Sequence, residues 1–429
     1  MTQRYDIYKH SGVQWLGEIP GHWECASLGR VLHDKLQYGA SESGDLEYTN
    51  DSMRYIRITD ITLDGKLKQD CCKYLSSEIG KNYPVRKGDV LLARSGATVG
   101  KAFIYNEDIE ACYAGYLIKA SIQQDIVFPT FFFYFTQTSQ YDEWKNRIFI
   151  QATIQNISAE KYTRMKLCIP PLSEQRSIVS FLDSKCGKID EWVTKKQKEV
   201  EHLQELKQRV IADAVTRGLN PHVKMKATNI PWLKEIPEHW ECVKLKMFCQ
   251  DNREKNKGNI ESCVLSLSYG NIIVKKNVTF GLVPENYDSY QIVNPGNIIL
   301  RLTDLQNDHK SLRTGLVKNR GIITSAYVGL IVKNMNSEYT QLILHSYDVM
   351  KVFYGMGGGL RQSMSYTDIA NIYIPVPPLS EQKQIVSYLD AKTSKIDKLI
   401  ANITKEIECI KEYKQRLTSD VVTGQIKVC

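Results

Sequence analysis

PPLSEQ, at residues 170–175, returns unchanged at residues 377–382, and each copy opens a long charged stretch. The two stretches align without a gap from Pro170 to Thr216 at a constant offset of 207 residues, with half of the positions identical. A self-match of this length marks an internal duplication. We therefore expect the fold to consist of two related halves.

Each repeated stretch has the pattern of one long α-helix. Its apolar residues recur in steps of three, four and seven, so they share one stripe of a helix, and Lys, Glu and Gln fill the other faces. This is typical of a coiled-coil seam. The double proline stops any helix from upstream, Ser173 or Ser380 is expected to cap, and Glu174 or Glu381 suits the first turn. The predicted seam consists of Ile178, Leu182, Ile189, Val193, Val200, Leu203, Val210, Ile385, Leu389, Ile396, Ile400, Ile403, Ile407, Ile410 and Leu417.

A helix with a single apolar stripe needs a partner, and the second copy lies in the same chain. We expect the two helices, each about 45 residues or about 65 Å long, to pack antiparallel about a pseudo-two-fold axis. The alternative is that each helix pairs with another molecule. The matched length and phase of the two seams favour the intramolecular pair.

A second, shorter repeat precedes each half. WLGEIPGHWEC at residues 15–25 resembles WLKEIPEHWEC at residues 232–242. Two tryptophans and a proline around a turn favour a structural clasp over a ligand-binding role for His22 or His239. The segments between each clasp and its helix share a plan of short strands and turns but have diverged in sequence.

The predicted class is α+β, with two α/β domains separated by the helices. We expect domain 1 at residues 1–171, the first helix at 172–220, domain 2 at 221–378 and the second helix at 379–429. Alternating residues predict a strand at 55–59 and another ending at Arg94, whose counterpart is the strand 295–301. Residues 128–144 and 339–352 are expected to be helical, and 147–158 to form a polar loop.

Composition narrows the class of partner. The 429 residues have room for several domains, and a net charge of +8 with a pI of about 8.7 is compatible with an acidic partner such as DNA. The eleven cysteines lack CxxC spacing, so a reducing cytoplasm is expected and a zinc or other metal site is not. The most apolar run, residues 126–135, is too short to cross a membrane.

Together these elements resemble the specificity subunit of type I restriction–modification systems. The resemblance rests on the two PPLSEQ helices with KID and KQR, the IPxHWE openings, and GDVLLARSGATVGK at residues 88–101. It implies that each variable region is a target recognition domain for one half of a split double-stranded DNA site. It also implies that the conserved helices form an antiparallel coiled coil that docks two adenine methyltransferase subunits. Restriction subunits, which are ATP-dependent translocases and nucleases, would complete the complex.

Catalytic motifs are missing from the sequence. There is no NPP[YF]-type motif for amino-methyl transfer, no GxGxxG, no Walker loop and no HExxH. We therefore expect a chain without catalytic residues and without a cofactor of its own. The resemblance places S-adenosylmethionine, ATP and Mg²⁺ in partner subunits.

The candidate DNA contacts are polar and basic residues near the predicted loops, because Arg forks onto guanine and Gln pairs with adenine, while Lys and Arg also bind phosphates. Each one taken singly is more often a solvated surface residue. Arg94 and Arg301 are favoured because the repeat is expected to place both at the same strand end. The candidates are Arg57, Thr59, Arg94, Ser95, Lys101, Arg147, Gln151, Gln155, Arg301, Thr303, Asp304, Lys310, Arg313, Arg361 and Gln362.

These loops differ between the halves, so an asymmetric DNA site is expected, with its unread spacer set by helix length. An alternative of another class is a coiled-coil scaffold that holds two protein partners and has no role on DNA. A third, a fused enzyme, is disfavoured by the missing motifs.

Overall fold

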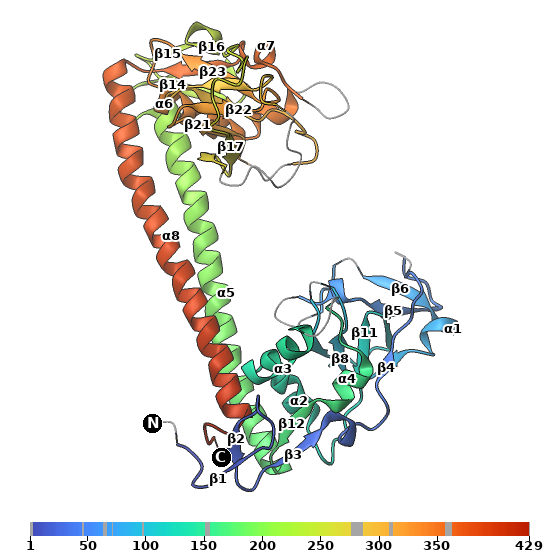
Figure 1. Ribbon diagram of the computed structural model, residues 1–429. Coiled ribbons are helices and arrows are strands. Elements are labelled where there is room, and N and C mark those ends of the chain that lie inside the picture. The colour runs from blue at the N-terminus through green and yellow to red at the C-terminus, as the bar shows by residue number, and fades with distance from the viewer. Residues whose placement is uncertain are drawn as a thin grey trace. The chain divides into compact units, whose positions relative to one another are not determined.

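The computed structural model describes residues 3–44, 47–62, 67–70, 72–96, 98–150, 155–275, 286–308, 312–356 and 363–428. The chain forms two compact units. Unit 1 contains Met1–Lys196 and Lys405–Cys429, and unit 2 contains Gln197–Thr404. Two long helices, α5 (Leu172–Arg217) and α8 (Leu379–Val422), each contribute one part to unit 1 and the other part to unit 2 (Figure 1).

Both long helices begin directly after the double proline, at Leu172 and Leu379. The carbonyl of Pro171 already accepts the N–H of Gln175 at 3.0 Å. Ser173 therefore lies inside the first turn, as does Ser380, and the prediction that these serines cap the helices is wrong. The predicted place of Glu174 in the first turn is confirmed.

Within each unit the two helices run antiparallel. In unit 1, Lys414 donates to Asp190 at 2.6 Å, and Cys186 lies 3.9 Å from the hydroxyl of Thr418, so residue numbers fall along one helix as they rise along the other. In unit 2, Lys207 donates to Asp397 at 2.7 Å. Every predicted seam residue is buried or half-buried.

The first turn of each long helix attaches a clasp. Glu174 accepts hydrogen bonds from Trp23 Nε1 at 2.9 Å and Tyr5 Oη at 3.0 Å, and it lies 2.6 Å from His22 Nε2. Burial opposes ionisation of Glu174, but these hydrogen bonds outweigh it and hold the pKa of the carboxyl below its ordinary value.

Unit 2 repeats the clasp with Glu381. Its carboxylate accepts from Trp240 Nε1 at 3.0 Å and lies 2.9 Å from His239 Nε2. Trp23 and Trp240 are both fully buried. The structural role predicted for the short repeat is confirmed, since both histidines are occupied by helix carboxylates.

The neighbouring glutamine ties the rest of each domain to the same turn. The buried side chain of Gln175 accepts the N–H of Phe128 at 2.7 Å and donates to the carbonyls of Ile126 and Pro170. Gln382 likewise accepts the N–H of Asn336 at 2.9 Å. Phe128 and Asn336 each stand immediately before a domain helix, so PPLSEQ repeats because both units need the same attachment.

Unit 1 is built around two four-stranded sheets. One has the order β4 (Gln37–Tyr38), β11 (Leu117–Ala120), β8 (Val90–Ala93), β9 (Ala102–Ile104), and the other β6 (Lys73–Ser76), β5 (Ser52–Ile56), β10 (Ala111–Tyr113), β7 (Pro84–Val85). Two strand pairs are β1 (Tyr8–His10) with β2 (Glu18–Pro20) and β3 (Glu24–Ser27) with β12 (Lys166–Ile169). The helices are α1 (Ser77–Gly80), α2 (Pro129–Phe135), α3 (Ser139–Ile150) and α4 (Ala159–Arg164), with 3-10 turns at Leu28–Arg30 and Ile58–Asp60.

Unit 2 repeats the first of these sheets and both strand pairs, but its described residues form no second four-stranded sheet. Its sheet has the order β16 (Cys249–Asp251), β23 (Val328–Val332), β20 (Ile298–Leu300), β21 (Thr314–Leu316). The strand pairs are β13 (Met225–Ile230) with β14 (Leu233–Pro237), β15 (Glu241–Lys244) with β24 (Tyr373–Val376), β17 (Leu265–Ser268) with β18 (Asn271–Val274), and β19 (Gln291–Val293) with β22 (Gly321–Ile323). The helices are α6 (Ser337–Val349) and α7 (Tyr366–Ile369), with 3-10 turns at Leu245–Met247 and Val352–Gly355.

Three sequence predictions need local correction. The strand predicted at 55–59 ends at Ile56, and a 3-10 turn follows it. The helix predicted at 128–144 is two helices, α2 and α3, because Thr136 and Thr138 bond back to carbonyls of the preceding turn and end the first. Arg147 consequently lies in α3 and not in a loop.

The chain termini meet within unit 1. The N–H of Lys427 donates to the carbonyl of Gln3 at 2.8 Å, and Tyr8 Oη donates to the carbonyl of Gly424 at 2.8 Å. In unit 2 the residues after α5 lead into β13, which pairs with β14 of the clasp. In unit 1 the corresponding place is therefore filled by two separate segments, the end of α8 and the N-terminus, whereas in unit 2 the segment after α5 is unbroken.

The long helices belong to the domain cores, and this predicts which unit loses stability when a buried side chain of a helix is shortened. Leu182 and Leu389 occupy equivalent positions and are fully buried, in the cores of unit 1 and unit 2 respectively. Leu182→Ala should destabilise unit 1 by about 2–5 kcal/mol, and Leu389→Ala should do the same to unit 2. Amide hydrogen exchange measured by peptide will show faster exchange in the strands of the affected unit. Equal loss in both units for each variant would contradict this division.

Candidate nucleic-acid interface

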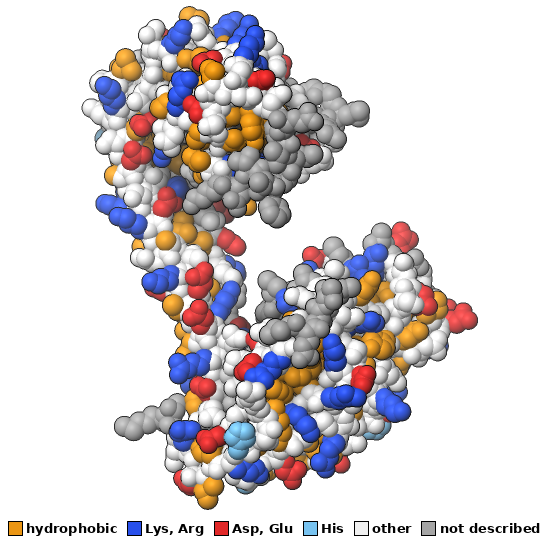
Figure 2. Space-filling model, in the orientation of Figure 1, with side chains coloured by type: hydrophobic (Ala, Val, Ile, Leu, Met, Phe, Trp, Pro, Cys, Tyr) orange, Lys and Arg blue, Asp and Glu red, His pale blue; other side chains and the backbone are white. Residues whose placement is uncertain are grey.

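Charge alone does not locate an interface on this molecule. On the face shown in Figure 2, lysine and arginine side chains are spread over the surface and interspersed with acidic ones. The site must therefore be built from the strand ends and loops that the fold presents, beginning with β8 and β20.

The hydrogen-bonded register corrects the expected pairing of Arg94 with Arg301. Leu92 stands opposite Ala102 in unit 1, and Leu300 stands opposite Thr314 in unit 2. Counting one residue on, Arg301 is equivalent to Ala93. Arg94 is equivalent to Leu302, which is buried. The two arginines are one residue out of step, and because side chains alternate along a strand they do not face the same way.

Arg94 lies at the wall of a hollow in unit 1. Its guanidinium carbon is 4.7 Å from the ring centre of Tyr38, a cation–π contact. Arg57, Thr59, Lys73 and the exposed Tyr116 line the same hollow. The structure thus brings together three of the predicted residues, Arg57, Thr59 and Arg94. Lys73 and Tyr116 join them, and both are residue types that bind nucleic acid.

Several contacts already occupy these side chains. Arg57 holds Asp60 through two bonds, with Nη2 at 2.6 Å and Nε at 3.1 Å, and Thr59 donates to the same carboxylate at 3.4 Å. This arrangement fixes the direction of the guanidinium. By contrast, Arg94 Nε is buried without a hydrogen-bond partner among the described residues, so Arg94 retains donor capacity beside the hollow.

The other candidates of the first domain are dispersed. Ser95 pairs through its backbone with Asn156 next to the exposed Gln155. Arg147, on α3, is bound to Glu143 of the same helix and to Gln14 of the N-terminal segment. Lys101 lines a different pocket, together with α8. Gln151 lies outside the described residues.

In unit 2 the loop after β20 is organised by one buried cation. Arg313 has no exposed surface, and its guanidinium donates to the carbonyls of Arg301, Thr303, Asp304 and Asp308 and to the hydroxyl of Tyr354. Its expected role in contacting DNA is therefore corrected: all its donors face the protein. Arg313 instead shapes the loop that carries the other candidates.

That loop presents Arg301, Thr303 and Asp304. Arg301 is one-third exposed and lies 3.5 Å from the Asp308 carboxylate, and Asp304 adopts a left-handed backbone with φ of 58°. A non-glycine residue in this region is uncommon and requires support from its surroundings, which the Arg313 bonds provide. Lys310, Arg361 and Gln362 lie outside the described residues.

Comparison with known proteins decides the family. A model of the type I restriction modification DNA specificity domain matches residues 21–202 and again residues 237–409. The chain belongs to the type I restriction–modification specificity family. Each match begins within a clasp segment and ends in a long helix, so the matched segments follow the duplication.

Curated relatives agree along nearly the whole length. The putative type I restriction enzyme MjaX specificity subunit of Methanocaldococcus jannaschii is 26% identical over 442 residues, with 96% of each chain covered. The type I restriction enzyme EcoBI specificity subunit of Escherichia coli is 22% identical, covering 96% of this chain and 88% of the other. As a specificity subunit, the chain is a non-catalytic recognition component of its system.

A solved structure shares the fold. A chain described under "Structural basis underlying complex assembly and conformational transition of the type I R-M system" superposes with a TM-score of 0.69 and 16% identity, over 95% of this chain and 99% of that one. Among the described residues of the specificity subunit, no helix is long and apolar enough to span a membrane. No group of three potential metal ligands is found there either.

Sequence reasoning missed Tyr38 and Tyr116. Tyr38 meets Arg94 only because β4 pairs with β11, and Tyr116 enters the hollow only because β11 lies beside β8. The available signal was an aromatic residue next to glycine, Gly115 and Tyr116, between two apolar segments.

The correction to Arg313 is testable in the specificity subunit. Arg313→Met should destabilise unit 2 by about 3 kcal/mol or more, because several buried carbonyls lose their donor. The matched control is Lys101→Met, at the equivalent strand position in unit 1, which should be nearly neutral because Lys101 is partly exposed. Denaturation midpoints and peptide-resolved hydrogen exchange measure both. A stable, normally protected Arg313→Met protein would show that its bonds do not support the loop.

Proposed function

We propose that this specificity subunit recognises an asymmetric, bipartite site on double-stranded DNA, with one target recognition domain in each unit. The observation that carries the proposal is that the same strand of the repeat, β8 in unit 1 and β20 in unit 2, leads into different structures. In unit 1 it leads to the hollow around Arg94, and in unit 2 it leads to the loop supported by Arg313. A repeated frame with dissimilar loops suits two dissimilar half-sites.

Recognition follows from the chemistry of these groups. Arginine donates two hydrogen bonds to the major-groove edge of guanine, and threonine or aspartate reads single donors and acceptors. Arg94, Arg57 and Thr59 are assigned to the first half-site, and Arg301, Thr303 and Asp304 to the second. Tyr38 orients Arg94 by stacking, and the exposed Tyr116 offers a flat face to a base or sugar. The length of the helix pair sets the unread spacer.

We further propose that the helices dock two identical partners, the adenine methyltransferase subunits. Leu206 and Tyr413 occupy equivalent positions of the repeat and are 48% and 54% exposed, so each helix presents a large apolar side chain at the same repeat position. Leu206 lies on the part of α5 that belongs to unit 2, and Tyr413 lies on the part of α8 that belongs to unit 1. The partners supply S-adenosylmethionine-dependent methylation, and restriction subunits add ATP- and Mg²⁺-dependent cleavage.

The competing function is a protein scaffold without a role on DNA. Binding to a DNA fragment at two salt concentrations separates the two, because phosphate contacts weaken steeply with salt. Retained, salt-insensitive association with protein partners and no DNA binding would favour the scaffold.

Exchanging the loop of unit 2 tests the two-reader model. Replacing residues 301–310 with a loop of equal length from a relative should change only the half-site assigned to unit 2. Equal length matters because Arg313 binds backbone carbonyls, which any sequence supplies. Each lost base contact costs about 1–3 kcal/mol. Methylation-sensitive sequencing of host DNA reads the site, and the half-site of unit 1 is the internal control. A change in both half-sites would contradict the model.

Partner docking is tested by single substitutions at the two exposed positions. Leu206→Asp and Tyr413→Asp should each remove one methyltransferase subunit, and the double variant should bind none, as counted by native mass spectrometry. The control pair is His202→Asp and Cys409→Asp, exposed positions that are also equivalent in the repeat and should leave both partners bound. Loss of both partners from one single substitution would show that the two sites are not independent.

A further inference from the structure

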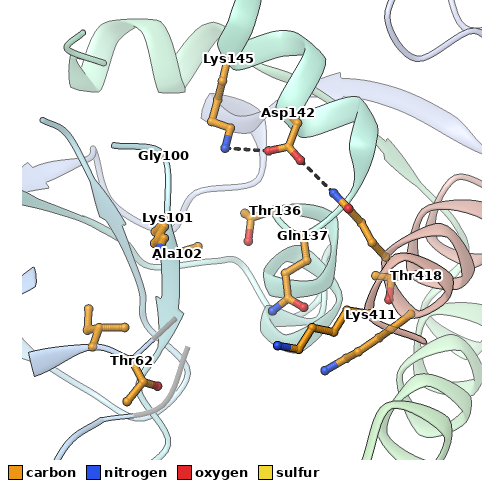
Figure 3. Close-up of a pocket in the computed structure, with 13 residues that line it drawn as sticks. Thr62, Gly100, Lys101, Ala102, Thr136, Gln137, Asp142, Lys145, Lys411 and Thr418 are labelled. Carbon is orange, nitrogen blue, oxygen red and sulfur yellow. Dashed lines mark hydrogen bonds and ion pairs between the residues drawn. The ribbon is translucent and has the colours of Figure 1, made fainter. Parts of the chain in front are cut away.

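A pocket rich in lysine lies in unit 1, between the target recognition domain and the last turns of α8. The turn before β9 contributes Lys101, α3 contributes Lys145 and Asp142, and α8 contributes Lys411 and Lys414. Figure 3 shows Lys145 turned toward Asp142, Lys101 on one side of the pocket beside Ala102, and Lys411 on the other side, with Gln137 between them. Four lysines and one aspartate among the lining residues make this pocket a place for an anion.

The internal ion pairs leave part of this charge uncompensated. Asp142 accepts from Lys145 at 2.7 Å and from Gln415 at 3.0 Å, and Lys414 is taken up by Asp190 at 2.6 Å. Among the residues that the structure describes, the ammonium groups of Lys101 and Lys411 form neither an ion pair nor a hydrogen bond. The pocket therefore presents two cations from two different elements.

The backbone of Gly100 favours glycine, because its positive φ is one that other residues rarely adopt. Its φ is 81°, and a Cβ at this position would stand 2.2 Å from Cδ of Lys145. The carbonyl of Gly100 also accepts from the buried Tyr141 hydroxyl at 2.8 Å. The turn before Lys101 is thus held in one conformation, with the Lys145 side chain passing close over it.

Unit 2 supplies an internal comparison. Ala102 and Thr314 are equivalent by register, so Lys101 is equivalent to Arg313. In unit 2 this cation is buried under its own loop and saturated by loop carbonyls. The loop from Arg94 to Lys101 is four residues shorter than the loop from Leu302 to Arg313. Among the described residues of unit 1, no loop carbonyl accepts from Lys101.

We propose that a ligand supplies the acceptors that Lys101 lacks within the described protein, and that Lys101 and Lys411 together bind one phosphate group of the DNA backbone. Gln137, which also lines the pocket, carries an amide donor suited to the same oxygens. Phosphate contacts fix register without reading sequence. A helix of the scaffold thereby takes part in DNA binding beside the loop that carries Arg94. The proposal rests on the DNA-recognition function proposed above.

The experiment measures how the DNA affinity of the full-length subunit depends on salt. Removing one phosphate contact lowers the slope of log K against log salt by about 0.9. Lys411→Gln should lower the slope by this amount for every DNA sequence, and Lys411→Arg should restore it. Lys405→Gln removes the same charge from an exposed position of α8 that does not line the pocket, and it should leave the slope unchanged.

A double variant tests whether the two lysines share a phosphate. Lys101→Gln with Lys411→Gln should lose the slope of one contact, about 0.9, and not of two. Additive losses would overturn a single shared site, and so would a Lys411→Gln slope equal to that of the unmodified chain. An altered methylated sequence in Lys411→Gln would mean a base contact and overturn the phosphate assignment.

A free anion is distinguished by inorganic phosphate at matched ionic strength. If phosphate raises the melting temperature of the chain but not of Lys411→Gln, while both retain the same DNA salt slope, the pocket holds free phosphate and the DNA assignment fails. Absence of DNA binding by the unmodified chain and by Lys405→Gln would instead count against the proposed function itself.

Discussion

The architecture depends on the first turn of each long helix. There, adjacent carboxylate and amide side chains reach in two directions: Glu174 or Glu381 holds the indole of a buried tryptophan, and Gln175 or Gln382 satisfies the backbone before a domain helix. A buried amide without a partner costs about 1–3 kcal/mol, so both bonds are expensive to lose. Each domain is consequently attached to its helix through this motif as well as through the shared apolar core, while the intervening loops are unconstrained by the motif.

The two units differ in how they accommodate a cationic side chain at the same position of the repeat. At one position before a strand, unit 1 has the partly exposed Lys101 and unit 2 has the buried Arg313. The longer loop of unit 2 can fold over the guanidinium and provide its acceptors, and a planar cation with five donors suits several carbonyls at once. The shorter loop leaves an ammonium facing a pocket. Loop length thus decides whether a cation organises the protein or remains available to a ligand.

The duplication, the long helices and the clasp could be predicted because they rest on periodicity and on side chains that pack. The start of α5 at Leu172 was predicted, but its cap was misassigned, because the Pro171 carbonyl, and not the Ser173 side chain, opens the helix. Arg94 and Arg301 were matched by identity, whereas only the strand register shows that they differ by one residue. The burial of Arg313 could not be predicted from the sequence either. Its acceptors are mostly backbone carbonyls, which every residue carries, so no side-chain pattern marks them.

The discontinuity of unit 1 has a consequence for biosynthesis. Its core includes Leu417, Val421 and Val422 at the end of α8, together with Trp23 and Ile178 from the first part of the chain. Unit 2 is one continuous segment, so it has all its core residues before the ribosome reaches the end of the message. Contacts across nearly the whole chain must close last, and such closure is slow. The N-terminal domain, although made first, therefore lacks part of its core until residues 405–429 have been made.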